Sequence, residues 1–168
     1  MAQNIKTVAV CTASPALTAI LAAVLAGKAG LRVRPFESKA GLTTYVRLAP
    51  VALLVCDLDD ADMVAALRRD ERLVEREMEV IALSRSLTRH DRELAVSSGI
   101  DEVILKPMSP AYLLERVVSR LGRMGEKSEA VGFAGVERRT QQRTPIAAYR
   151  RVTDNVVQLF PHSWQPNP

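Results

Sequence analysis

The sequence predicts an α/β protein built around a doubly wound parallel sheet of five strands. Two observations support this class. Short apolar runs recur between residues 7 and 105, and stretches with the spacing of amphipathic helices follow them. The run Val51–Cys56 is apolar throughout rather than alternating with polar residues, as expected for a strand that helices cover on both faces.

The strand candidates are short runs rich in Val, Ile or Leu, which favour extended structure. Connections between parallel strands are right-handed crossovers, so each intervening helix packs on one face of the sheet. Five strand–helix units fit the flavodoxin-like strand order 2-1-3-4-5, and we expect this (βα)5 fold. The five runs are residues 7–11, 31–36, 51–56, 79–83 and 102–105.

Helix starts are marked by capping residues, and in two cases proline follows at the first helical position. Apolar residues at helical spacing predict the face that each helix buries. This face includes Ile20 and Leu48 in the first two helices and Val118 in the last. The helices are predicted to follow Ser14 and Ser38, to cover Asp62 to about Glu71, and to follow Thr88 and Ser109.

Composition excludes several other classes of protein. The chain has 168 residues, of which 48% are hydrophobic and 25% charged, as in ordinary globular proteins. No apolar run approaches the ~18 residues of a membrane span, and the N-terminus lacks the pattern of a signal peptide. The net charge is only +4, so nucleic-acid binding is not favoured. We expect a cytoplasmic protein with no membrane contact, and Cys11 and Cys56 as buried free thiols.

Polar residues end three of the predicted strands, at the edge where open α/β sheets bind ligands. Asp57, Ser84 and Lys106 follow the third, fourth and fifth runs, and these strands are neighbours in the predicted order. An anion held on Asp57 could accept a hydrogen bond from Ser84 and a charge-assisted one from Lys106. The alternative is a structural aspartate that caps a turn and forms a salt bridge with Lys106.

Residues 5–122 resemble the receiver domain of two-component response regulators. The match rests on Asp57 at the end of VALLVCD, Ser84 in IALSR, and SSGIDEVILKPMSPAYLLERV from Ser97 to Val117. This last segment combines a Gly-x-Asp-x-x-x-x-Lys-Pro pattern with a capped amphipathic helix. The resemblance implies that a histidine kinase or phosphotransfer protein phosphorylates Asp57. It also implies that Ser84 is the switch hydroxyl, that Lys106 contacts the phosphoryl group, and that the Lys–Pro bond is cis.

The sequence departs from the receiver pattern near the expected metal site. Receivers place two acidic residues that bind Mg²⁺ after the first strand, but this chain has Cys11 and Thr12. The aromatic switch position, three residues before the lysine, is Val103. We therefore expect Mg²⁺ binding to be weak or absent, with Asp57 and Asp59 as its candidate ligands and Asp60 as an alternative to Asp59. Asp59 and Asp60 are otherwise expected to form a solvated turn.

Residues 123–168 are predicted to be a linker, a short amphipathic helix and an extended tail. The helix is expected from Pro145 to Phe160, because Ile146, Tyr149, Val152 and Val156 recur at helical spacing. It could dock on its own receiver or on a partner. The segment is short for a DNA-binding output domain and shows no recognition-helix pattern.

The expected function is a response regulator in a phosphorelay, phosphorylated on Asp57, that signals by contact with a downstream protein. The contact face would be the fourth helix, fifth strand and fifth helix, which could also form a homodimer. The protein is not expected to be an enzyme in the ordinary sense. One alternative is a phosphorylation-independent pseudo-receiver that serves as a binding scaffold. A flavodoxin-like enzyme or nucleotide binder would need a glycine-rich phosphate loop, and CTASPAL after the first strand has no glycine.

Overall fold

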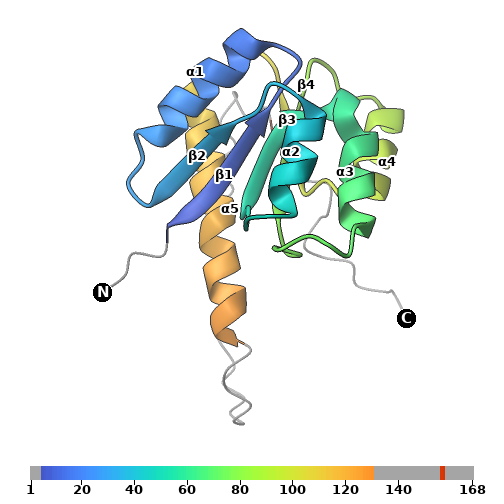
Figure 1. Ribbon diagram of the computed structural model, residues 1–168. Coiled ribbons are helices and arrows are strands. Elements are labelled where there is room, and N and C mark those ends of the chain that lie inside the picture. Colours follow the sequence, from blue (N-terminus) through green and yellow to red (C-terminus); the bar gives the residue numbers. More distant parts are fainter. Residues whose placement is uncertain (1–4, 131–155, 158–168) are drawn as a thin grey trace, which may run out of the picture.

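The computed structural model describes residues 5–130 and Val156–Val157, and it confirms the predicted architecture (Figure 1). Five parallel strands lie in the order β2-β1-β3-β4-β5, with a sixth, β6, beyond β5. The strands are β1 Lys6–Cys11, β2 Leu31–Pro35, β3 Leu53–Asp57, β4 Glu79–Ser84, β5 Glu102–Leu105 and β6 Val156–Val157. The helices are α1 Pro15–Ala26, α2 Lys39–Val46, the 3-10 turn η1 Leu58–Asp60, α3 Ala61–Arg69, α4 Arg89–Ser98 and α5 Pro110–Ala130.

The sheet separates two apolar layers. Helices α1 and α5 cover one face, and α2, α3 and α4 cover the other (Figure 1). Successive residues of β3 point to opposite faces, so Val55 packs with the α1 and α5 layer whereas Leu54 and Cys56 pack with the other. All of β3 is buried, as predicted for a central strand. Asp57 is therefore the end of the most enclosed strand rather than part of a surface loop.

The predicted helix caps are confirmed. The Ser14 hydroxyl accepts a hydrogen bond from the Leu17 amide at 3.3 Å, and the Ser38 hydroxyl accepts one from the Gly41 amide at 3.1 Å. Thr88 forms a reciprocal capping box with Asp91 at the start of α4. These caps fix where the helices begin, and so they fix the lengths of the loops that connect each strand to the helix after it.

Three residues that were predicted to face inward are exposed. Ile20 is 54% exposed, because the buried stripe of α1 runs through Thr18, Leu21, Ala22 and Leu25 and leaves Ile20 outside it. Leu48 is 76% exposed because α2 ends at Val46. Val118 on α5 is 38% exposed. In each case helical spacing alone placed a residue on a buried face that is narrower or shorter than predicted.

Helix α5 continues to Ala130, so the residues just after 122 are helical and not the predicted linker, whereas the domain boundary itself stays a prediction. Its last turns extend past the strand ends (Figure 1). The predicted helix from Pro145 to Phe160 is also wrong at Val156 and Val157, which form β6 antiparallel to β5. The rest of that helix and the extended tail lie outside the described residues. No helix in the described part of the chain is both long enough and apolar enough to cross a membrane.

The two edges of the sheet differ. Strand β2 forms one edge, where Arg32 and Arg34 are exposed and Pro35 ends the strand. The other edge is β6, which pairs Val157 with Val103 and Val156 with Ile104. Its antiparallel direction differs from that of every other strand pair in the described sheet.

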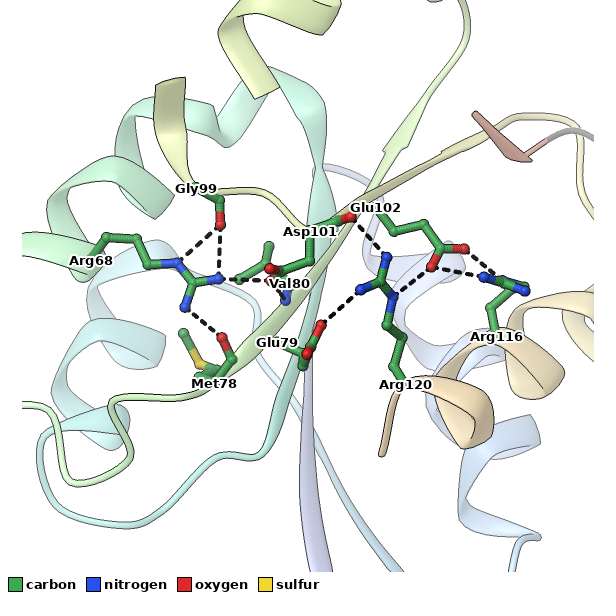
Figure 2. Close-up of polar contacts among 9 residues, drawn as sticks. All are labelled: Arg68, Met78, Glu79, Val80, Gly99, Asp101, Glu102, Arg116 and Arg120. Carbon is green, nitrogen blue, oxygen red and sulfur yellow. Dashed lines mark hydrogen bonds and ion pairs between the residues drawn. The ribbon is translucent and has the colours of Figure 1, made fainter. Parts of the chain in front are cut away.

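Arg68 of α3 connects the end of α4 to the start of β4 (Figure 2). Its guanidinium donates to the Gly99 carbonyl at 2.8 and 3.0 Å and to the Met78 carbonyl. It also pairs with Asp101 at 2.8 Å, and the same carboxylate oxygen accepts the Val80 amide at 2.7 Å. Arg68 thereby holds together the segment that leads into β4 and the segment that leads into β5.

Arg116 and Arg120 attach α5 to the first residues of β4 and β5 (Figure 2). Glu102 is 1% exposed and accepts hydrogen bonds from Arg116 at 2.6 Å and from Arg120 at 2.7 Å. Arg120 also pairs with Glu79 at 3.1 Å. The charge on the buried Glu102 carboxylate is therefore balanced by two guanidinium groups from one helix.

Candidate functional site

Asp57 lies at the carboxyl end of β3 and is 5% exposed. Its Oδ1 accepts a hydrogen bond from Lys106 Nζ at 2.8 Å, and its Oδ2 accepts one from the Ala13 amide at 2.7 Å. One donor comes from the loop after β5 and the other from the loop after β1. Both carboxylate oxygens are thus bound by donors of the same chain.

Lys106 follows β5, and its side chain is 27% exposed. Its amide donates to the Ser84 carbonyl at 2.6 Å, which joins the ends of β5 and β4. The Lys106–Pro107 peptide bond is cis, as the resemblance implied. The predicted convergence of Lys106 with Asp57 is therefore present.

Ser84 ends β4 as predicted, but its hydroxyl is bonded within its own loop. Ser84 Oγ donates to the Ser86 carbonyl at 2.6 Å. A role as a switch would require the side chain to rotate away from this carbonyl, and it stays a prediction. Val103, at the aromatic switch position, is fully buried in the layer of α2, α3 and α4.

The Thr12 hydroxyl forms its hydrogen bonds within the loop between β1 and α1. Thr12 Oγ1 donates to the Ser14 carbonyl at 3.0 Å and lies 2.9 Å from Thr18 Oγ1. The Thr12 amide also donates to Thr18 Oγ1 at 3.1 Å. These bonds fix the chain just before Ala13, whose amide contacts Asp57.

Cys11 and Cys56 are free and buried, as expected. They lie side by side, in register on β1 and β3. Burial raises the pKa of both thiols, and the nearby Asp60 and Asp57 carboxylates raise it further. Thiolate formation is therefore disfavoured, and packing accounts for both residues.

Asp59 and Asp60 differ, although both were predicted to lie in a solvated turn. Asp59 is exposed, as that prediction requires. The prediction is wrong for Asp60, which is buried at 7% exposure and forms an ion pair with Lys39 of α2. Sequence reasoning missed Lys39, because the two partners lie on different elements and no local pattern connects them.

The residues present do not fit the magnesium site that the resemblance implies. Mg²⁺ prefers several oxygen ligands in near-octahedral geometry. Here Cys11 offers a buried sulfur, the Thr12 hydroxyl is used within its loop, and Asp60 is paired with Lys39. Within the described residues, no three His, Cys, Asp or Glu side chains are grouped as a metal site. The proposed ligation by Asp57 and Asp59 stays a prediction.

No protein-family model and no curated protein matches the sequence at a significant level. Solved structures do match the chain. In each of the three examples that follow, the matched region covers 98% of the other protein's chain. Chemotaxis protein CheY4 of Vibrio cholerae is 15% identical over 68% of this chain, with a TM-score of 0.62. A CheY-like response regulator receiver domain protein from Methanospirillum hungatei is 14% identical over 73%, with a TM-score of 0.65. A response regulator from Thermotoga maritima is 24% identical over 70%, with a TM-score of 0.60.

These likenesses establish the fold. The sheet of β1 to β5 with α1 to α5 has the CheY-like, flavodoxin-like fold of these structures. Asp57 and Lys106 lie at the carboxyl edge of this sheet, where the doubly wound fold places ligands.

Proposed function

We propose that this protein is a receiver protein of a two-component phosphorelay that is phosphorylated on Asp57 and signals by protein–protein contact. The observation that carries the proposal is the contact between buried Asp57 and Lys106 at the carboxyl edge of a receiver-like sheet. A buried carboxylate beside a cation in such a position is a typical functional site. The donor would be a histidine kinase or a phosphotransfer protein.

The proposed reaction transfers a phosphoryl group from a donor imidazole to a carboxylate oxygen of Asp57. The P–N bond breaks while the new P–O bond forms, and the departing nitrogen keeps the electron pair and takes a proton from solvent. Lys106 would move from the carboxylate to the phosphoryl oxygens and stabilise their negative charge. The Ala13 amide, 2.7 Å from Asp57 Oδ2, holds the carboxylate in place.

The proposed contact face consists of α4, β5 and α5. Val96 on α4 is 43% exposed, so α4 presents an apolar side chain to a partner. The partner would be a downstream protein or a second copy of the chain. Strand β6 lies along β5 and is therefore part of any contact made through the edge of this face.

The experiment is mass spectrometry after incubation with a small phosphodonor such as acetyl phosphate, and with a phosphorylated phosphotransfer protein. We expect a labile phosphoryl adduct on the wild type that Asp57→Asn removes. Asp62→Asn is the matched control, because Asp62 is an exposed carboxylate five residues away and its substitution should leave the adduct in place. An adduct that survives Asp57→Asn would place the acceptor elsewhere.

A phosphorylation-independent scaffold is the second candidate, and the double hydrogen bonding of Asp57 favours it. A carboxylate with both oxygens bound is a weaker nucleophile, and it needs no phosphoryl group to hold Lys106 in place. The two candidates differ in partner binding. Partners captured equally by the wild type and Asp57→Asn, with no adduct from any donor, would support the scaffold.

A further inference from the structure

Lys39 brings a second ammonium group to the edge of the sheet that carries Asp57. It is the first residue of α2, and its Nζ pairs with Oδ1 of Asp60. The Asp60 side chain is 9% exposed, whereas that of Lys39 is 60% exposed. Lys39 therefore reaches from the surface onto a carboxylate that would otherwise be buried without a cation.

The charges of Lys39 and Asp60 both act on the thiol of Cys11, the last residue of β1. Burial is the main cause of the raised pKa of the Cys11 thiol, the Asp60 and Asp57 carboxylates raise it further, and the Lys39 ammonium lowers it. The Asp60 contact likewise raises the pKa of Lys39 above its ordinary value, so the ammonium stays protonated. Asp57 ends β3, Asp60 lies in the turn η1 that follows, and Lys39 pairs with Asp60, so all three charges lie at the carboxyl end of β3.

The buried charges at this edge are balanced without a metal ion. Asp57 and Asp60 are the buried carboxylates, and each is paired with one lysine ammonium, Lys106 and Lys39 respectively. A divalent cation binds where carboxylates leave an excess of negative charge. To bind Asp60 here, the ion would have to displace Lys39 and then lie close to a like charge.

We propose that Lys39 takes the place of a divalent metal ion near the Asp57 site, by holding Asp60 and supplying a fixed positive charge at the edge of the sheet that carries the phosphoacceptor. This inference rests on the proposed function for the role of Asp57. The balance of charge around Asp60 does not depend on it. Lys39 acts as a positioning and charge-balancing residue, and Lys106 is the group that contacts Asp57.

The first test is a Mg²⁺ and Mn²⁺ titration of the unphosphorylated full chain, followed through the amide signals of Ala13 and Asp60 in NMR spectra. The wild type should show no saturable binding through the millimolar range. Lys39→Met should bind at least about tenfold more tightly, because it removes a positive charge and frees Asp60. Lys28→Met is the matched control, since it removes an exposed lysine before β2, at the opposite end of the strands.

A double variant identifies the ligand. Lys39→Met combined with Asp60→Asn should lose the gained affinity, because the freed carboxylate is then absent. The amide spectrum of each variant reports whether the fold is intact, and the high exposure of the Lys39 side chain favours an intact Lys39→Met protein. Millimolar Mg²⁺ binding by the wild type, or no gain in Lys39→Met, would overturn the inference.

The second test separates this inference from the proposed function. If Asp57 accepts phosphoryl groups, the wild-type adduct should form equally well in excess EDTA and in Mg²⁺, whereas Lys39→Met should become dependent on Mg²⁺. A chain that forms no adduct would contradict the proposed function, and the metal titration would still decide the role of Lys39. A wild-type adduct that disappears in EDTA would contradict the role of Lys39 and leave phosphorylation of Asp57 supported.

Discussion

Gly99 joins α4 to β5 through a backbone conformation that other residues adopt only with strain. Its φ is +77°, in the left-handed region, and a Cβ there would lie 3.0 Å from Cγ of Arg68. Its carbonyl is the acceptor for that same arginine. Any side chain at this position would therefore strain the backbone and also disturb the Arg68 contacts.

We expect Gly99→Ala to lower the free energy of unfolding by about 1–2 kcal/mol through the backbone conformation alone. Displacement of Arg68 would add to this loss. The matched control is Gly122→Ala in α5, where a Cβ meets no atom within 4 Å and the helix favours alanine. That variant should gain about 0.5–1 kcal/mol. Urea denaturation measures the free energy of unfolding of both variants. If Gly99→Ala unfolds with the same free energy as the wild type, a side chain at this position causes no backbone strain.

Some site residues were predictable from the sequence and others were not. Asp57 and Lys106 each end a strongly apolar strand run, and the parallel order of those strands brings them together. The burial of Asp60 and its contact with Lys39 depend on how α2 packs beside η1, which local spacing does not encode. The hydroxyl positions of Ser84 and Thr12 likewise depend on loop hydrogen bonds that strand and helix patterns do not show.

At the scale of elements, α5 is attached to the sheet by charge as well as by apolar contact. Its apolar residues Leu113, Val117 and Leu121 are buried against the sheet. Arg116 and Arg120 lie on the same helix and hold the buried Glu102 at the start of β5. This attachment fixes one end of β5, and Lys106 follows its other end.

The Glu102 cluster makes stability depend on pH. Burial acts to raise the pKa of Glu102, but the hydrogen bonds and charges of Arg116 and Arg120 outweigh it, so the pKa lies below its ordinary value of 4.5. A carboxyl whose pKa is lower in the folded state stabilises the fold fully above the unfolded pKa. That stabilisation is lost as the pH falls from about 4.5 through the folded pKa.

We expect Glu102→Gln to lower the free energy of unfolding at pH 7 by about 1–3 kcal/mol, because two charged donors lose their ionised acceptor. The difference between wild type and variant should shrink as the pH falls below 4.5, the ordinary pKa of the group. Denaturation at a series of pH values measures this. Glu77→Gln, which removes an exposed carboxylate, is the control and should change stability little at any pH. A constant difference for Glu102→Gln would contradict the lowered pKa.

Most elements were predictable because their signals are local. Caps and apolar spacing placed each helix start within a residue or so, and short β-branched runs placed the five parallel strands. The end of α5 was mispredicted because GEKSEA has the polar composition of a linker as well as of an exposed helix. Strand β6 was missed because two residues are too few to show the alternation of apolar and polar residues that marks a strand. Its partner strand also lies about 50 residues earlier in the chain.

At the scale of the whole molecule, β6 connects the C-terminal part of the chain to the edge of the receiver-like sheet. The pairs Val103–Val157 and Ile104–Val156 occupy backbone groups of β5 that would otherwise be open along this edge. The edge lies between α4 and α5 in the proposed contact face. Contact between this face and a partner therefore depends on whether β6 stays in place.

We expect removal of residues 131–168 to increase amide hydrogen exchange in Glu102–Leu105, because β5 loses its antiparallel neighbour. The truncated protein should also self-associate more at high concentration, which sedimentation velocity measures. The control removes only residues 158–168 and keeps β6. Unchanged exchange in β5 after the longer truncation would show that β6 contributes no protection there.

The unequal edges of the sheet determine how the molecule could polymerise. Arg32, Arg34 and Pro35 on β2 discourage the addition of another strand, since their charge and the missing N–H group oppose edge-to-edge pairing. Strands of other molecules are therefore expected to add to the described sheet only beyond β5. At that edge β6, a strand of the same chain, already pairs with β5 and blocks the addition. Aggregation of this protein should accordingly be one-sided, and its onset should follow the release of a two-residue strand rather than global unfolding.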